Sequence, residues 1–174
     1  MRRLIFLLVT AALIAGVFVT MTAKARAGHA DGGAAPYVTT MPPGYRDWKF
    51  ISVAHEEAGL NSFSAVLGND VAIKAYRART LPYPDGTIIV ALHYSFVPSE
   101  ENDKVFGKPQ SFVAGAPTNV QFMIKDSKKY AVTGGWGFGH FKDGKPADAT
   151  FMQPCFPCHA LDKNDDMVFT HYAP

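Results

Sequence analysis

Cysteine is the scarcest informative residue in this chain. Only Cys155 and Cys158 occur among 174 residues. No second C-x-x-C and no H-x-x-x-H spacing accompanies them, so the further ligands that a structural zinc site needs are missing. In an oxidising compartment the two thiols could still form a strained C-x-x-C disulfide of the thioredoxin type.

An excess of basic residues is also missing. Lys plus Arg number 17 against 15 Asp plus Glu, which gives a formal charge of +2. Four of the basic residues lie within the first 27 positions, so residues 28–174 carry 13 − 15 = −2. No basic stripe is present, and we therefore expect no nucleic-acid partner.

The N-terminus has the pattern of a secretory signal peptide. Arg2 and Arg3 precede an apolar run over residues 4–21, and "ARA" at 25–27 offers an A-x-A cleavage site. We predict a cleavable leader over residues 1–27 and export to the periplasm. An uncleaved membrane anchor is the less favoured alternative, because the apolar run is close to the lower limit of a membrane span.

After cleavage the chain suits one domain. Residues 28–43 are rich in Gly, Ala and Pro and are predicted to form a flexible N-terminus. Residues 44–174 would then form the folded domain.

The folded part is predicted to be α+β, mostly an antiparallel β-sheet with flanking helices, and not a helix bundle. Residues 67–81 have apolar residues at helical spacing, with Asn69 or Asp70 as the N-cap. "TIIVALHYSFV" at 87–97 and "TNVQFMIKD" at 118–126 are expected to be strands. "PSEENDKVFGKPQ" at 98–110 is expected to be a polar loop.

Glycine alternates with large side chains in "TGGWGFGHFKDGK" at 133–145, which predicts a strand and a hairpin turn. In a strand Trp136, Phe138 and His140 would share one face, and the intervening glycines the other. A glycine face allows the close approach of another part of the chain or of a flat ligand. Tight packing is the favoured explanation.

The two cysteines are followed at once by His159, in "CFPCH". C-x-x-C-H is the attachment signature of a c-type haem. Each thiol adds to one haem vinyl group, so Cys155 and Cys158 would be the covalent anchors. His159 would be the proximal iron ligand, with its second ring nitrogen donating to a backbone carbonyl or water. A redox disulfide is the alternative.

The sixth iron position has no clear ligand in the sequence. Electron-carrying cytochromes commonly fill it with Met. A five-coordinate iron with an apolar distal side is the other possibility. The candidates for ligation are Met123, Met152, Met167, His55, His93, His140 and His171.

The late position of the haem motif in a β-rich chain resembles the cytochrome P-460 family, which includes the β-type cytochromes c-prime. The resemblance covers most of the chain after the leader and implies a mostly antiparallel fold, usually homodimeric, with one haem c. The matching stretches are "YRDW" (45–48), "GND" (68–70), "PDGT" (84–87), "VQFMIKDSKKYA" (120–131), "GGWGFGHF" (134–141), "CFPCH" (155–159) and "DMVFTHYAP" (166–174).

The resemblance implies a vacant or water-filled distal position. Enzymatic members of the family oxidise hydroxylamine, whereas the β-type cytochromes c-prime bind nitric oxide and carbon monoxide beneath an aromatic cap. The positions that this resemblance assigns to the haem surroundings are Phe63, Ala91 and Gln121.

Three departures from the enzymatic pattern stand at these positions. Ala91 replaces a lysine that bonds to the haem edge in the enzymes, and Lys74 is expected on the preceding helix. Gln121 replaces a distal carboxylate, and an amide cannot act as a general base at neutral pH. Phe63 lies in the "FSA" segment where a distal arginine is expected, and it is a candidate aromatic cap.

We therefore expect a periplasmic cytochrome with one covalent haem c and an open site for a small ligand such as nitric oxide. An oxidoreductase of hydroxylamine or nitrogen-oxide chemistry and a six-coordinate electron carrier are the alternatives. A redox partner protein could dock on the acidic "LDKNDD" at 161–166, although a solvated surface is the favoured explanation for this cluster.

Overall fold

The computed structural model describes residues 35–173. The predicted signal peptide, residues 1–27, lies outside the described residues, as do residues 28–34 of the segment expected to be flexible. Within residues 35–173, no helix is long and apolar enough to cross a membrane.

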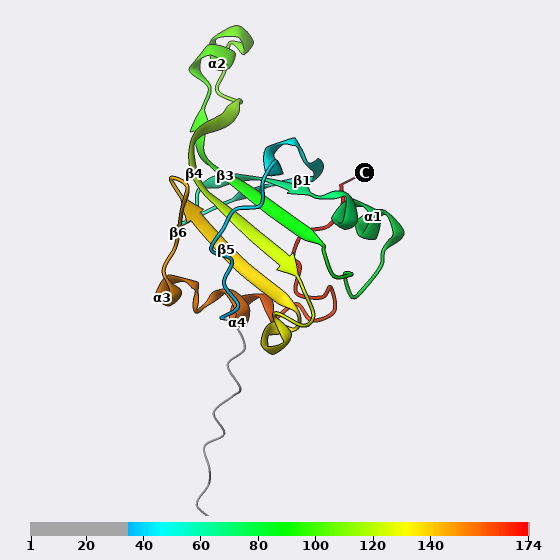
Figure 1. Cartoon of the computed structure of the whole chain (residues 1–174). Coiled ribbons are helices and arrows are strands. Elements are labelled where there is room, and N and C mark those ends of the chain that lie inside the picture. The colour runs from blue at the N-terminus through cyan, green and yellow to red at the C-terminus, as the bar shows by residue number, and fades with distance from the viewer. Residues whose placement is uncertain (1–34, 174) are drawn as a thin grey trace, which may run out of the picture. The chain divides into compact units, whose positions relative to one another are not determined.

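A single antiparallel sheet dominates the described part of the chain (Figure 1). Its strands follow one another in chain order, and each pairs with the next as a meander. This confirms the predicted antiparallel α+β class. The strands are β1 (Lys49–Glu56), β2 (Ser62–Gly68), β3 (Ile88–Pro98), β4 (Phe112–Lys125), β5 (Trp136–Lys142) and β6 (Lys145–Pro146).

Short helices flank the sheet. The predicted helix at 67–81 is present as α1, capped by Asn69, whose side chain accepts a hydrogen bond from the backbone N–H of Ala72 at 2.9 Å. That contact satisfies one of the N–H groups that a helix start leaves free. The helical elements are η1 (Tyr45–Asp47), α1 (Asp70–Ala78), α2 (Glu100–Phe106), η2 (Ala131–Thr133), α3 (Ala149–Met152) and α4 (Cys155–His159).

The expectation of a polar loop over residues 98–110 is wrong in its centre, where α2 forms. Ser99 caps the helix by accepting from the N–H of Asn102, and Gly107 ends it in a left-handed conformation at φ 70°. Glu100 and Glu101 in the first turn complement the helix dipole. Figure 1 shows α2 at the tip of the long β3–β4 hairpin, away from the rest of the sheet.

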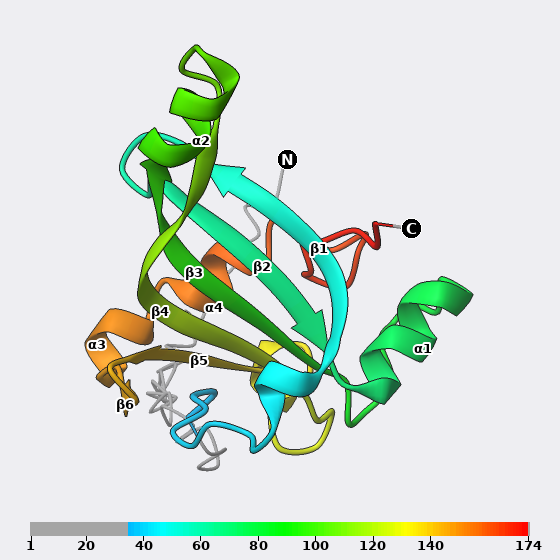
Figure 2. The ribbon, with the colours of Figure 1, turned by 90° about the horizontal axis from the view of Figure 1, so that it is seen from above.

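The sheet has apolar side chains on both faces. The pocket face carries Ile89, Ala91 and Phe138 and is covered by α1, α4 and the C-terminal segment. The opposite face carries Val90 and Phe122 and is partly covered by residues 38–48. Figure 2 shows the sheet from above, with the short helices and the C-terminal segment around it.

Residues 36–38, within the segment that was expected to be flexible, lie against β5. Tyr37 bridges Phe138 in parallel fashion, and the N–H of Val38 donates to the carbonyl of Phe138 at 2.6 Å. Val38 is buried. Backbone hydrogen bonds and burial therefore tie residues 36–38 to β5, and the flexibility of the rest of the segment stays a prediction.

The glycine face of β5 is filled by the protein's own side chains. A Cβ on Gly137 would overlap the ring of Tyr130, and one on Gly139 would come within 3.0 Å of Val38. Both contacts lie on the opposite face, away from the C-x-x-C-H motif. They favour the packing explanation of the glycine alternation over contact with a flat ligand.

Candidate functional site

The C-x-x-C-H motif forms the short helix α4. Cys155 and His159 stand four residues apart, so they project from one face of the helix, and both line the same pocket. Cys158 is exposed, and the two thiols are not joined to each other. Burial raises the pKa of the Cys155 thiol.

The pocket has a volume of about 110 Å³ and lies between α4, the C-terminal segment and the pocket face of the sheet. Most of its lining is apolar. The lining residues are Val66, Ile89, Ala91, Gln121, Phe122, Met123, Phe138, Gly139, His140, Cys155, His159, Val168, Phe169 and Thr170.

His159 is held on three sides. Its Nδ1 lies 2.8 Å from the carbonyl oxygen of Met167, and because a carbonyl can only accept, Nδ1 carries the proton. The ring stacks on Phe169 at 4.7 Å between centroids and lies tilted against Phe138 at 5.1 Å. Burial lowers the pKa of His159, against the effect of the Met167 hydrogen bond. The neutral ring therefore has Nε2 left over as a metal-binding nitrogen.

The sheet contributes the other wall of the pocket. Ala91 on β3 pairs with Gln121 on β4, and Gln121 pairs with His140 on β5. All three line the pocket. The side-chain amide of Gln121 donates to Asn119 Oδ1 at 3.0 Å. The structure thus brings Ala91 and Gln121 together with Cys155 and His159 around one pocket.

Phe63 does not join them. It alternates with Ser62 and Ser64 along β2, and its ring contacts His55 and Phe96 at centroid distances of 5.7 and 4.8 Å. Its cross-strand neighbour is Tyr94, which packs with the opposite-face cluster. Phe63 therefore lies on the opposite face, and the expectation that it caps the distal side is corrected.

No lysine of the described residues lies where it could bond to a haem in this pocket. Lys74 is exposed on α1, as expected, and it is not among the residues that line the pocket. Ala91 stands where the family resemblance expects a lysine, and no described pocket-lining residue is a lysine.

Only two of the candidate sixth ligands line the pocket, Met123 and His140. Met152 is buried in the core beside the pocket. The methyl end of Met167 fills the space that a side chain on Gly134 would take. The remaining histidines, His55, His93 and His171, do not line the pocket.

A buried histidine and a carboxylate contact each other further along the pocket face. His93 is buried, and its Nδ1 is 3.5 Å from Glu56 Oε2. Ser62 donates to the same carboxylate oxygen at 3.2 Å. Burial lowers the pKa of His93, partly offset by the charge of Glu56. Burial also lowers the pKa of His140, and the charges of His93 and Lys142 act in the same direction.

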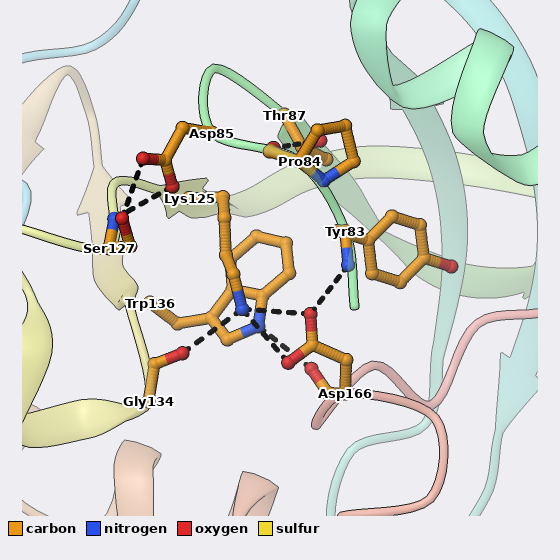
Figure 3. Close-up of polar contacts among 9 residues, drawn as sticks. All are labelled: Tyr83, Pro84, Asp85, Thr87, Lys125, Ser127, Gly134, Trp136 and Asp166. Atoms are coloured by element: carbon orange, nitrogen blue, oxygen red, sulfur yellow. Dashed lines mark hydrogen bonds and ion pairs between the residues drawn. The ribbon is translucent and has the colours of Figure 1, made fainter. Parts of the chain in front are cut away.

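The sequence analysis missed a buried ion pair near the site. Lys125, the last residue of β4, is only 6% exposed and contacts Asp166 from the C-terminal segment at 2.8 Å (Figure 3). Asp166 belongs to the "LDKNDD" cluster, which was expected to be solvated. One signal was present in the sequence: Lys125 directly follows the apolar run at 122–124.

These residues fit a c-type haem. The thiols are free, the histidine has Nε2 available because Nδ1 is committed to Met167, and an apolar pocket lies beside them. Within residues 35–173, no group of three or more His, Cys, Asp or Glu side chains could hold a metal ion directly, so the zinc alternative finds no ligand set there.

A short helix that carries the C-x-x-C-H motif and lies against an antiparallel meander is the arrangement expected of a β-rich haem protein, in contrast to the helical cytochromes. The comparison with protein families agrees. The model of the family described as Cytochrome P460 matches residues 42–170, and the chain belongs to this family, whose members are haem-binding cytochromes. No curated protein matches the chain.

Proposed function

We propose that this chain holds one haem covalently through Cys155 and Cys158, with His159 as the proximal ligand. The observation that carries the proposal is the commitment of Nδ1 to the Met167 carbonyl, which leaves Nε2 for iron. The rings of Phe138 and Phe169 pack against the imidazole. The bound haem would supply a one-electron redox couple and a coordination position for a small ligand.

We further propose that the position opposite His159 takes a small ligand such as nitric oxide. Ala91, Val66 and Ile89 give the sheet wall an apolar character that excludes water and disfavours charged ligands. Gln121 supplies a hydrogen-bond donor and acceptor but no proton-accepting carboxylate. Binding of an uncharged gas fits this lining better than oxidation of hydroxylamine does.

An optical experiment tests both statements. The purified protein should give a positive pyridine haemochrome, a high-spin ferric spectrum and a new spectrum on addition of nitric oxide. Cys155→Ala or Cys158→Ala alone should retain part of the attached haem, whereas the double variant should lose it on denaturation. A wild-type protein without haem would end the proposal.

A six-coordinate electron carrier is the second candidate, because Met123 and His140 both line the pocket. A low-spin spectrum that does not respond to nitric oxide would select it. A redox partner protein would then exchange electrons with the haem.

The leader over residues 1–27 supports export to the periplasm, where haem would be attached. Fractionation of cells that express the full chain should find the haem protein in the periplasmic fraction. A variant lacking residues 2–27 should remain in the cytoplasm without attached haem.

The family resemblance supports a homodimer, and the opposite face of the sheet has suitable exposed apolar side chains. Phe112 stacks on Phe96 at 4.2 Å yet is 49% exposed, and Val53 is 62% exposed. Light scattering should report twice the chain mass. Phe112→Ser should shift the equilibrium towards the monomer if this face is the interface.

A further inference from the structure

The buried amine of Lys125 has every hydrogen-bonding direction occupied. Its Nζ contacts both carboxylate oxygens of Asp166, at 2.9 and 2.8 Å, and the carbonyl oxygen of Gly134 at 3.0 Å (Figure 3). It also lies 4.8 Å from the centre of the Trp136 ring. Burying two charges is costly, and it is tolerated only where the pair is fully hydrogen-bonded. The ion pair is therefore a rigid contact between β4 and the C-terminal segment.

Asp166 is fixed by two further contacts. Its Oδ2 accepts from the backbone N–H of Tyr83 at 2.9 Å, and its backbone carbonyl accepts from the indole N–H of Trp136 at 2.8 Å (Figure 3). Asp166 in the C-terminal segment is thus contacted by three separate parts of the chain. These are the last residue of β4, the first residue of β5 and the turn before β3.

The backbone at this point has an unusual shape. Asp166 and Met167 both have left-handed conformations, at φ 51° and 67°. Such residues other than glycine are uncommon and persist where surrounding contacts over-determine them. The Met167 side chain fills the open space above Gly134, where an added Cβ would come within 2.5 Å of its methyl carbon.

The turn ends at the proximal histidine. The carbonyl of Met167, directly after Asp166, is the group that accepts from His159 Nδ1 at 2.8 Å. Within the described residues, the ion pair stands one peptide unit from the hydrogen bond that orients the imidazole.

We propose that the Lys125–Asp166 ion pair is a positioning device for His159. It holds the left-handed turn that presents the Met167 carbonyl to Nδ1, and so sets the orientation and basicity of the imidazole. The inference rests on the proposed haem ligation by His159. Lys125 and Asp166 touch neither haem nor ligand in this role, and they act through Met167.

The direction of the effect follows from the chemistry of the hydrogen bond. A strong bond from Nδ1 to a carbonyl makes Nε2 a better electron donor, which favours ferric over ferrous iron. Loosening the turn weakens that bond. The reduction potential should therefore rise when the ion pair is removed.

The holoprotein of wild type and Asp166→Asn should be compared by redox titration and by resonance Raman of the ferrous form. Asp166→Asn keeps a side chain that can accept from Tyr83 but removes the charge that pairs with Lys125. We expect a higher potential and a lower iron–histidine stretching frequency. Lys125→Arg retains the charge and should stay close to wild type.

The matched control is Asp70→Asn, which breaks the exposed pair at 2.6 Å between Lys49 of β1 and Asp70 of α1. Its potential should equal that of wild type. If Asp166→Asn does not fold, Trp136→Phe removes the donor to the Asp166 carbonyl while keeping an aromatic ring beside Lys125, and it should raise the potential by a smaller amount.

A lower melting temperature with unchanged potential and Raman band would overturn the inference and leave the ion pair a purely structural role. A wild type that carries haem without an iron–histidine bond from His159, seen as an unchanged spectrum in His159→Gly, would overturn the proposed ligation as well. These two outcomes are distinguishable, because the first leaves the His159 requirement intact.

Discussion

Gln121 and Ala91 are directly paired across β4 and β3, and both side chains line the pocket that contains His159. The pair combines a neutral amide with a methyl group at the two positions where the family resemblance expects a carboxylate and a lysine. No Asp or Glu is present among the described residues lining the pocket. The described lining therefore lacks the proton-accepting capacity of a carboxylate, although it includes the imidazole of His140.

Gln121→Glu should supply that capacity. A carboxylate in the pocket can accept a proton, and general-base catalysis typically contributes about 10²-fold or more, so hydroxylamine oxidation should rise towards that factor. Steady-state turnover with an artificial electron acceptor measures it. Asn119→Asp is the matched control, because Asn119 is the next same-face residue on β4 and lies outside the pocket lining. Wild-type turnover as fast as that of the Glu variant would contradict the prediction.

The two side chains that could close the sixth position give a second prediction. With an open iron, Met123→Leu and His140→Phe should both keep the high-spin ferric spectrum of the wild type, since neither side chain is bound to the metal. Absorption spectra of the three proteins are sufficient. A low-spin wild type that becomes high-spin in His140→Phe would identify His140 as a ligand and favour the electron carrier.

The buried His93 should make stability depend on pH. Its pKa in the folded state is lowered from 6.5 by burial, so the unfolded chain binds the proton more tightly. The free energy of unfolding should thus be constant above about pH 6.5 and fall as the pH drops from there through the folded-state pKa. In His93→Gln this part of the slope should disappear.

Urea unfolding at several values between pH 7.5 and 5 measures that slope. The charged group that acts on His93 is Glu56 on β1. His93 in turn lowers the pKa of His140 on β5, as does Lys142. His171→Gln serves as the control, because His171 is exposed and lies in the C-terminal segment. Equal slopes in His93→Gln and wild type would refute the role of His93.

Gly137→Ala tests the tight packing of β5. An added Cβ would overlap the ring of Tyr130, which is itself buried, and overpacking typically costs about 1 to 3 kcal/mol. Chemical unfolding should show a loss of that size. Gly59→Ala is the comparison, because nothing lies within 4 Å of the position where its Cβ would be. Equal free energies of unfolding in the two variants would show that the Tyr130 ring moves aside without destabilising the fold.

Much of the fold was predictable because its signals are local. Asn69 before an amphipathic run predicted α1, and β-branched and aromatic runs predicted β3 and part of β4. The α2 helix was missed although Ser99 and Gly107 are ordinary helix-cap residues. Its polar composition concealed a helix that buries none of its residues and depends on its caps.

The candidate site was predictable only in part. Phe63 was placed beside the haem from its position in the sequence, but a strand alternates its side chains between faces, so an alignment uncertain by one residue changes the face. Ala91 and Gln121 do line the pocket, because the register between β3 and β4 places both side chains on the pocket face.

The amino-acid sequence by itself determined the haem motif, because Cys155, Cys158 and His159 lie within five residues and their chemistry depends on that short spacing. Only the tertiary structure decided what surrounds the histidine. Lys125 and Asp166 are 41 positions apart. The Met167 carbonyl contacts His159 through a left-handed turn that no local sequence pattern predicts. Contacts of this kind arise from the pairing of strands and the packing of the C-terminal segment, so they exist only once the chain has folded.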